Sequence, residues 1–185
     1  INTLLKEKKF KEAKLVIKKG KRQGIDRKKL NLLQAQLNVK SKKEIGTHNA
    51  PSQQQLDTLL DYYRSGRLNE AKELAISITK EFSTNQFSWK ILAAVLKQTG
   101  ELNESLFASQ KSVQLSPQDT ESHYNLGNTY KELGQLNEAE ASYKQAIALK
   151  SDFPEAHSNL GVILNALGRL HEAELSCKKA IELNP

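Results

Sequence analysis

The residues of this 185-residue sequence that could do chemistry are two histidines, one cysteine and closely spaced glutamates. His123 and His157 could form a pair of metal ligands, and Cys177 could be a reactive thiol. Glu138 and Glu140 could supply an acid and a base. They are two residues apart, however, and such residues point to different sides of a helix. The glutamates therefore do not favour a cooperating pair.

The spacing of the other candidates favours packing over chemistry. Trp89, His123 and His157 are evenly spaced, with a step of 34 positions from each to the next. An aromatic packing position explains all three better than a metal site. Cys177 follows Tyr143 by the same step, on an inward helix face, so we expect a buried and unreactive thiol.

The sequence contains none of the common catalytic or cofactor-binding strings. It has no glycine-rich phosphate loop, Cys-x-x-Cys, His-Glu-x-x-His or Gly-x-Ser-x-Gly. We therefore expect no enzyme activity from this chain, no catalytic residue, no cofactor and no metal ion. The full-length protein stays open in this respect, because the chain begins with Ile1 and has no methionine, and we expect it to be a fragment.

Net charge divides the chain into two parts. Residues 1–50 carry 15 Lys and Arg against 4 Asp and Glu, a net of +11, whereas residues 51–185 carry 13 against 17, a net of −4. The basic part could bind phosphate groups, but it has one aromatic residue, Phe10, and no nucleic-acid motif. A solvated basic face on helices is the favoured interpretation, and nucleic acid is an unlikely partner that only residues 1–50 could bind.

The same step of 34 positions recurs as a repeat through the rest of the sequence. Its markers are four glycines, each followed by Leu two residues later and Glu four residues later: Gly66, Gly100, Gly134 and Gly168. The period defines four tandem units, 52–85, 86–119, 120–153 and 154–185.

Each unit predicts two amphipathic helices. In the third unit, residues 122–133 and 136–149 place their apolar residues three and four positions apart. Gly134, between them, predicts a left-handed helix stop. Small residues at Gly127 and Ala139 would let the two helices approach closely. Because one helix pair cannot bury both apolar sides, neighbouring pairs must stack.

These columns resemble the tetratricopeptide repeat (TPR) family. In the third unit the matching residues are His123, Leu126, Gly127, Tyr130, Gly134, Ala139, Tyr143 and Ala146. The resemblance covers residues 52–185 and implies an all-α fold, an α-solenoid of tandem helix-turn-helix repeats in a right-handed superhelix. The repeats look most similar to those of O-linked N-acetylglucosamine transferase-type and bacterial TPR proteins.

The N-terminal part fits the repeat poorly. Residues 1–38 predict a degenerate basic helical segment, a truncated TPR-like hairpin followed by one helix, and residues 39–51 predict a polar linker. The alternative is a continuous but degenerate solenoid.

The resemblance implies a peptide-binding groove, because the first helix of each TPR unit lines the concave wall. Asn125 and Asn159, each just before Leu-Gly, look like the asparagine ladder of O-linked N-acetylglucosamine transferases, in which amides hold peptide backbone. The alternative is that these positions are only exposed surface. The expected groove residues are Lys90, Tyr124, Asn125, Asn128, Lys131, Ser158, Asn159 and Asn165.

Two functions follow. The first is a protein-interaction scaffold that binds an extended peptide or a helix of a partner. The alternative is the substrate-presenting arm of a glycosyltransferase or sulfotransferase-like enzyme with a catalytic domain beyond Pro185. The longest apolar run, 91–96, is too short to span a membrane, so we expect no membrane partner and a cytoplasmic protein. The apolar last helix would also allow end-to-end self-association.

Overall fold

The computed structural model of the chain describes residues 50–184, so the expectations for residues 1–49 lie outside the described residues. The described part contains eight α-helices and no strand. The helices are α3 (Gln53–Arg64), α4 (Leu68–Glu81), α5 (Gln86–Gln98), α6 (Leu102–Leu115), α7 (Thr120–Glu132), α8 (Leu136–Leu149), α9 (Pro154–Ala166) and α10 (Leu170–Leu183). None of them is long and apolar enough to cross a membrane.

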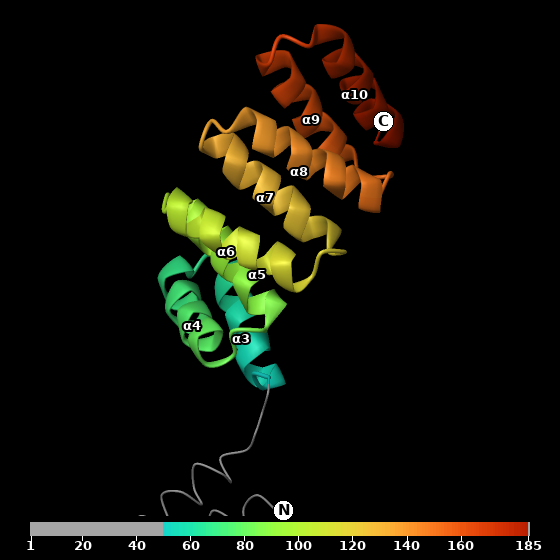
Figure 1. Cartoon of the computed structure of the whole chain (residues 1–185). Helices are drawn as coiled ribbons and strands as arrows, with labels where there is room; N and C mark the ends of the chain where they lie inside the picture. The colour runs from blue at the N-terminus through green and yellow to red at the C-terminus, as the bar shows by residue number, and fades with distance from the viewer. Residues whose placement is uncertain (1–49, 185) are drawn as a thin grey trace, which may run out of the picture. The chain divides into compact units, whose positions relative to one another are not determined.

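The helices of residues 50–184 form pairs that stack in sequence order (Figure 1). The two helices of a pair, such as α7 and α8, lie side by side and are joined by a short turn, and each pair packs against the pair that follows. The predicted all-α solenoid is confirmed.

A glycine ends the first helix of every pair in the described chain. At the end of α7, the Gly134 N–H donates to the Lys131 carbonyl at 3.1 Å, and the Gln135 N–H donates to the Tyr130 carbonyl at 2.9 Å. This is a Schellman motif, whose penultimate residue must be left-handed. The predicted stop is confirmed by positive φ angles at Gly66 (73°), Gly100 (81°), Gly134 (73°) and Gly168 (77°).

A second glycine lets α7 and α8 approach each other. A Cβ built on Gly127 would lie 2.7 Å from Cε1 and 2.8 Å from Cδ1 of the Tyr143 ring. Tyr143 and Ala139 are fully buried at this contact. The close approach predicted from the small residues is therefore confirmed, and the large ring of Tyr143 is the partner that requires Gly127.

The apolar core is divided between α6 and α7. One cluster of buried apolar residues spans α3 to α6, and a second joins α8, α9 and α10, with residues of α7 packed against it. Small hydroxyl side chains line the joint between them. Ser105 donates to the Ala93 carbonyl at 2.8 Å, and the hydroxyls of Ser112 and Ser122 lie 2.7 Å apart. This joint is held by hydrogen bonds more than by apolar burial.

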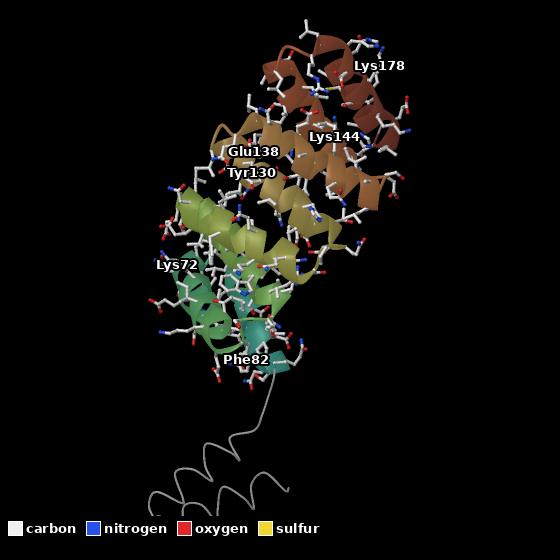
Figure 2. All side chains as sticks on the ribbon, in the orientation of Figure 1. Lys72, Phe82, Tyr130, Glu138, Lys144 and Lys178 are labelled. Carbon is white, nitrogen blue, oxygen red and sulfur yellow. The ribbon has the colours of Figure 1, made fainter. Side chains whose placement is uncertain are left out.

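An ion pair recurs between consecutive pairs with its charges exchanged. Lys72, at the edge of α4, lies 2.6 Å from Glu101 (Figure 2). Glu140 lies 2.7 Å from Arg169, and these residues follow the first two by 68 positions, or two repeat periods. The repeat therefore keeps a pair of opposite charges at this joint while the sign at each position changes.

Substitution of Gly127 tests the close approach. Alanine favours helix by about 1 kcal/mol over glycine, so Gly127→Ala without a clash would stabilise the protein. We expect the clash with Tyr143 to dominate and to lower the free energy of unfolding by about 1–3 kcal/mol in urea titrations. Gly161→Ala is the matched control, because its new methyl group would meet mainly the Cys177 thiol, which is exposed and can rotate. Equal losses in the two variants would contradict this explanation.

Candidate functional site

Four of the eight expected groove residues meet at one place. The side chains of Tyr124, Asn128 and Lys131, from α7, gather around Asn159 of α9. Their spacing explains why they gather, because positions three and four apart on a helix share one face. The face of α7 that carries them meets the beginning of α9.

Hydrogen bonds within the protein occupy most of the Asn159 amide. Its Nδ2 donates to the Tyr124 hydroxyl at 3.0 Å and to Asn128 Oδ1 at 3.1 Å, and its Oδ1 accepts from Lys131 Nζ at 3.1 Å. An asparagine amide has two hydrogens and two acceptor lone pairs, so one lone pair remains for another donor. In this conformation Asn159 holds α9 to α7 and has little capacity for a peptide backbone.

Tyr143 completes this cluster from below. Its hydroxyl donates to Asn128 Oδ1 at 2.8 Å, which satisfies two buried polar groups at once. Burial raises the pKa of the Tyr143 phenol well above its ordinary value, so the phenol remains a protonated donor. The sequence analysis placed Tyr143 in an apolar packing column and missed this polar role. Only the pairing of a buried tyrosine with an asparagine one helix earlier could have indicated it.

The equivalent residue Asn125 lies in different surroundings. Its side chain is half-buried and makes no hydrogen bond to the residues that the structure describes. The reason is the preceding unit: one repeat period before Tyr124 and Asn128 lie Lys90 and Ala94, which offer no equivalent hydroxyl and amide. The two asparagines share a repeat position but differ in partners.

A cavity of about 430 Å³ opens beside this cluster. Its polar lining comes from three expected concave positions, Glu155, Ser158 and Asn159, together with Tyr124 and Asn184. The apolar lining is Pro154, Ala180 and Ile181. Glu155 and Ser158 are exposed, and the Tyr124 ring is held by Phe153 at a centroid distance of 4.9 Å. The cavity therefore offers a fixed aromatic ring, an apolar side and accessible hydrogen-bonding groups.

Lys90 lies in a separate polar cluster between α5 and α7. Its Nζ is 2.6 Å from Glu121 and 3.4 Å from Asp119. Burial works against the charge of Lys90, but the hydrogen bond and charge of Glu121, together with Asp119, outweigh it and raise the pKa of the amine. Asp119 also accepts from Gln86 Nε2 at 2.9 Å and from the Ser122 hydroxyl. Lys90 thus joins two repeat units.

Sequence comparison assigns the repeats to a known family. Models described as "TPR repeat" and "Tetratricopeptide repeat" match residues 127–168, 154–185 and 108–141. The chain belongs to the tetratricopeptide repeat family. No curated protein matches the sequence.

Solved TPR structures share the fold. The crystal structure of MamA is 26% identical over 69% of this chain and 77% of that chain, with a TM-score of 0.65. A MamA RS-1 double mutant is 18% identical, over 95% and 94% of the two chains, with a TM-score of 0.68. YrrB, described as a TPR protein with an unusual peptide-binding site, is 23% identical over 67% and 64%, with a TM-score of 0.63. The last two show likeness of fold alone.

The aromatic position of the TPR unit has a hydrogen-bonding role here. Trp89 Nε1 donates to the Ser83 carbonyl at 2.8 Å, six residues earlier. His123 Nε2 lies 2.9 Å from the Pro117 carbonyl and His157 Nε2 lies 3.1 Å from the Ser151 carbonyl, again six residues earlier. A carbonyl only accepts, so Nε2 carries the proton in both histidines. Each ring fixes the turn before its own TPR unit.

The expectation of a buried Cys177 is wrong, because its side chain is exposed. The thiol follows Tyr143 by one TPR period and faces Gly161 as Tyr143 faces Gly127. The difference lies in what covers the outer helix: α9 and α10 follow α8, while no described helix follows α10. Asn165 is likewise exposed, near the end of α9, and the structure does not bring it into the Asn159 cluster.

The two asparagines provide a matched pair of variants. Asn159→Ala removes three hydrogen bonds and leaves the Tyr124 hydroxyl and Lys131 without this partner, so we expect a loss of about 1–3 kcal/mol in the free energy of unfolding. Asn125→Ala removes no described side-chain hydrogen bond and should stay within about 0.5 kcal/mol of the natural sequence. Urea unfolding followed by circular dichroism measures both. Similar values for the two variants would remove the structural role of Asn159.

Asp119 predicts a pH dependence of stability. Burial opposes its charge, but the Ser122 hydroxyl and Lys90 lower its pKa below the ordinary value. A carboxyl with a lowered pKa stabilises the fold above its unfolded pKa of about 4, and this contribution disappears as the pH falls through the folded pKa. Solvent screening at this half-exposed group limits the effect to about 1 kcal/mol.

We therefore expect Asp119→Asn to be less stable than the natural sequence at about pH 6, and the difference to shrink as the pH approaches 3. Thermal unfolding across this pH range measures it. A difference that is constant with pH would show that the charge of Asp119 does not contribute.

Proposed function

We propose that this TPR protein is an interaction scaffold whose concave face binds an extended peptide or a helix of a partner protein. The family and the MamA-like fold support an interaction scaffold. The observation that carries the finer proposal is the cavity beside Asn159, where expected groove positions of α7 and α9 meet the end of α10. A cytoplasmic location belongs to this proposal and is compatible with the single cysteine.

The groups around the cavity define the ligand chemistry. Glu155 and Ser158 are exposed and can pair with backbone N–H groups or a basic side chain, while Ile181, 66% exposed, offers apolar contact. Glu155 is the charged residue of the lining, so a ligand with a Lys or Arg is favoured over an acidic one. Tyr124, Asn128, Lys131 and Asn159 shape the wall by holding one another.

Selection from a random 12-residue peptide library against the full 185-residue chain tests this proposal. We expect selected peptides to bind less tightly, by at least tenfold, to Ser158→Arg, which fills the cavity. Ala141→Arg, on the exposed side of α8, is the control and should bind normally. The proposal fails when no peptide is selected, or when every selected peptide binds Ser158→Arg as tightly as the natural sequence.

The transferase-arm alternative stays a prediction. It is favoured by the exposed apolar residues of α10, Leu170 at 65%, Leu175 at 54% and Ile181 at 66%, which another helix pair could cover. End-to-end self-association would use the same residues. A dimer that Ile181→Asp dissociates in analytical ultracentrifugation would favour self-association, whereas a monomer in both proteins would oppose it.

A further inference from the structure

An apolar groove lies between α4 and α6, on residues that the concave-face proposal does not use. It has a volume of about 430 Å³ and a floor formed by Leu92 and Leu96 of α5. Ile76 of α4 and Phe107 of α6 form its sides, and they remain 45% and 54% exposed. Trp89 completes the floor. The groove therefore presents large apolar side chains at a surface, which soluble helices normally avoid.

The walls of this groove are fixed before any ligand arrives. The Trp89 and Phe107 rings meet edge to face, with centroids 5.8 Å apart and planes at 76°. The hydrogen bond from Trp89 Nε1 to the Ser83 carbonyl holds the indole in place. Rigid aromatic walls bind a ligand with a smaller loss of side-chain entropy than mobile ones.

The repeat itself does not require these apolar residues. One period later, the positions of Ile76, Trp89 and Phe107 are occupied by Gln110, His123 and Ala141. Two periods later they are occupied by Lys144, His157 and Leu175. The same fold thus forms joints with at most one large apolar residue at these positions. The combination of three large apolar residues is therefore a feature of the first joint alone, and packing of the solenoid does not explain it.

The charges at the groove mouth indicate what would occupy it. Lys72 and Glu101, at 2.6 Å, neutralise each other. Glu104 also lines the groove, and no ion pair within residues 50–184 includes it. The mouth is therefore apolar with an excess negative charge, and electrostatic complementarity favours a ligand that carries a positive charge beside its apolar residues.

We propose that the groove between α4 and α6 binds an amphipathic helix of a partner protein in which large apolar residues three or four positions apart are flanked by Lys or Arg. The helix would lie between α4 and α6, with its apolar residues on Leu92 and Leu96 and its cation beside Glu104. This is the helix-in-groove mode of recognition, in which one face supplies the anchors. It is independent of the concave-face proposal, since the two cavities share no residue.

The fold supplies its own variants for a test. Ile76→Gln and Phe107→Ala place in this joint the residues that the next joint already carries, so the double variant should keep the melting temperature of the natural sequence within a few degrees. Glu104→Gln removes the charge alone. Trp89 is the single tryptophan of the chain, so its fluorescence reports on the groove directly.

Subtractive selection would use a displayed library of 18-residue amphipathic helices without tryptophan. The library is first depleted on the full-length double variant and then selected on the full 185-residue natural chain. We expect the remaining peptides to carry apolar residues three or four positions apart next to Lys or Arg, and to shift Trp89 emission. Their affinity should fall at least tenfold in the double variant and about threefold to fivefold in Glu104→Gln, while Ser158→Arg, on the other cavity, should bind as the natural chain does.

Several results would overturn the proposal. They are the absence of any peptide after depletion, selected peptides with acidic flanks, and binding that leaves Trp89 emission unchanged. A concentration-dependent dimer that the double variant abolishes would assign the groove to a second copy of this chain. Loss of binding in Ser158→Arg alone would point to the concave face instead, so failure of one proposal is distinguishable from failure of the other.

Discussion

Each helix pair in residues 50–184 has a second side that only its neighbour can cover, and the rest of the structure depends on this constraint. The protein meets it differently at each joint. Apolar residues dominate between α4 and α5, hydroxyl groups such as Ser112 and Ser122 dominate between α6 and α7, and an asparagine with its partners joins α7 to α9. Because contacts are made only between neighbouring pairs, each joint can have its own chemistry without disturbing the others.

The same constraint separates residues that hold the solenoid together from residues that can hold a ligand. Asn159 lies at a position suited to a peptide backbone, yet its amide is engaged by Tyr124, Asn128 and Lys131. Engagement of this kind fixes the wall of the neighbouring cavity, which leaves Glu155 and Ser158 as its accessible polar groups. The concave surface is therefore ordered by one set of polar residues and open through another.

Two surfaces with different chemistry follow from this arrangement. The cavity beside α9 combines polar and apolar lining, whereas the groove between α4 and α6 is mainly apolar with one carboxylate at its mouth. A solenoid can carry both because its surface positions vary from unit to unit while the packing positions repeat. Ile76 and Gln110 are one period apart, and the fold accepts either residue.

The sequence by itself determined the period, the helices, the glycine turns and the family. These features are local: an apolar pattern of three and four residues makes a helix, and a left-handed stop needs glycine at Gly134 and its equivalents. The sequence also placed Tyr124, Asn128, Lys131 and Asn159 on expected groove positions. Tertiary structure alone decided that Asn159 is engaged while Asn125 is not, and that Cys177 is exposed while Tyr143 is buried. The physical reason is that equivalent positions of a repeat share a backbone but not their neighbours, and hydrogen bonding and burial depend on the neighbours.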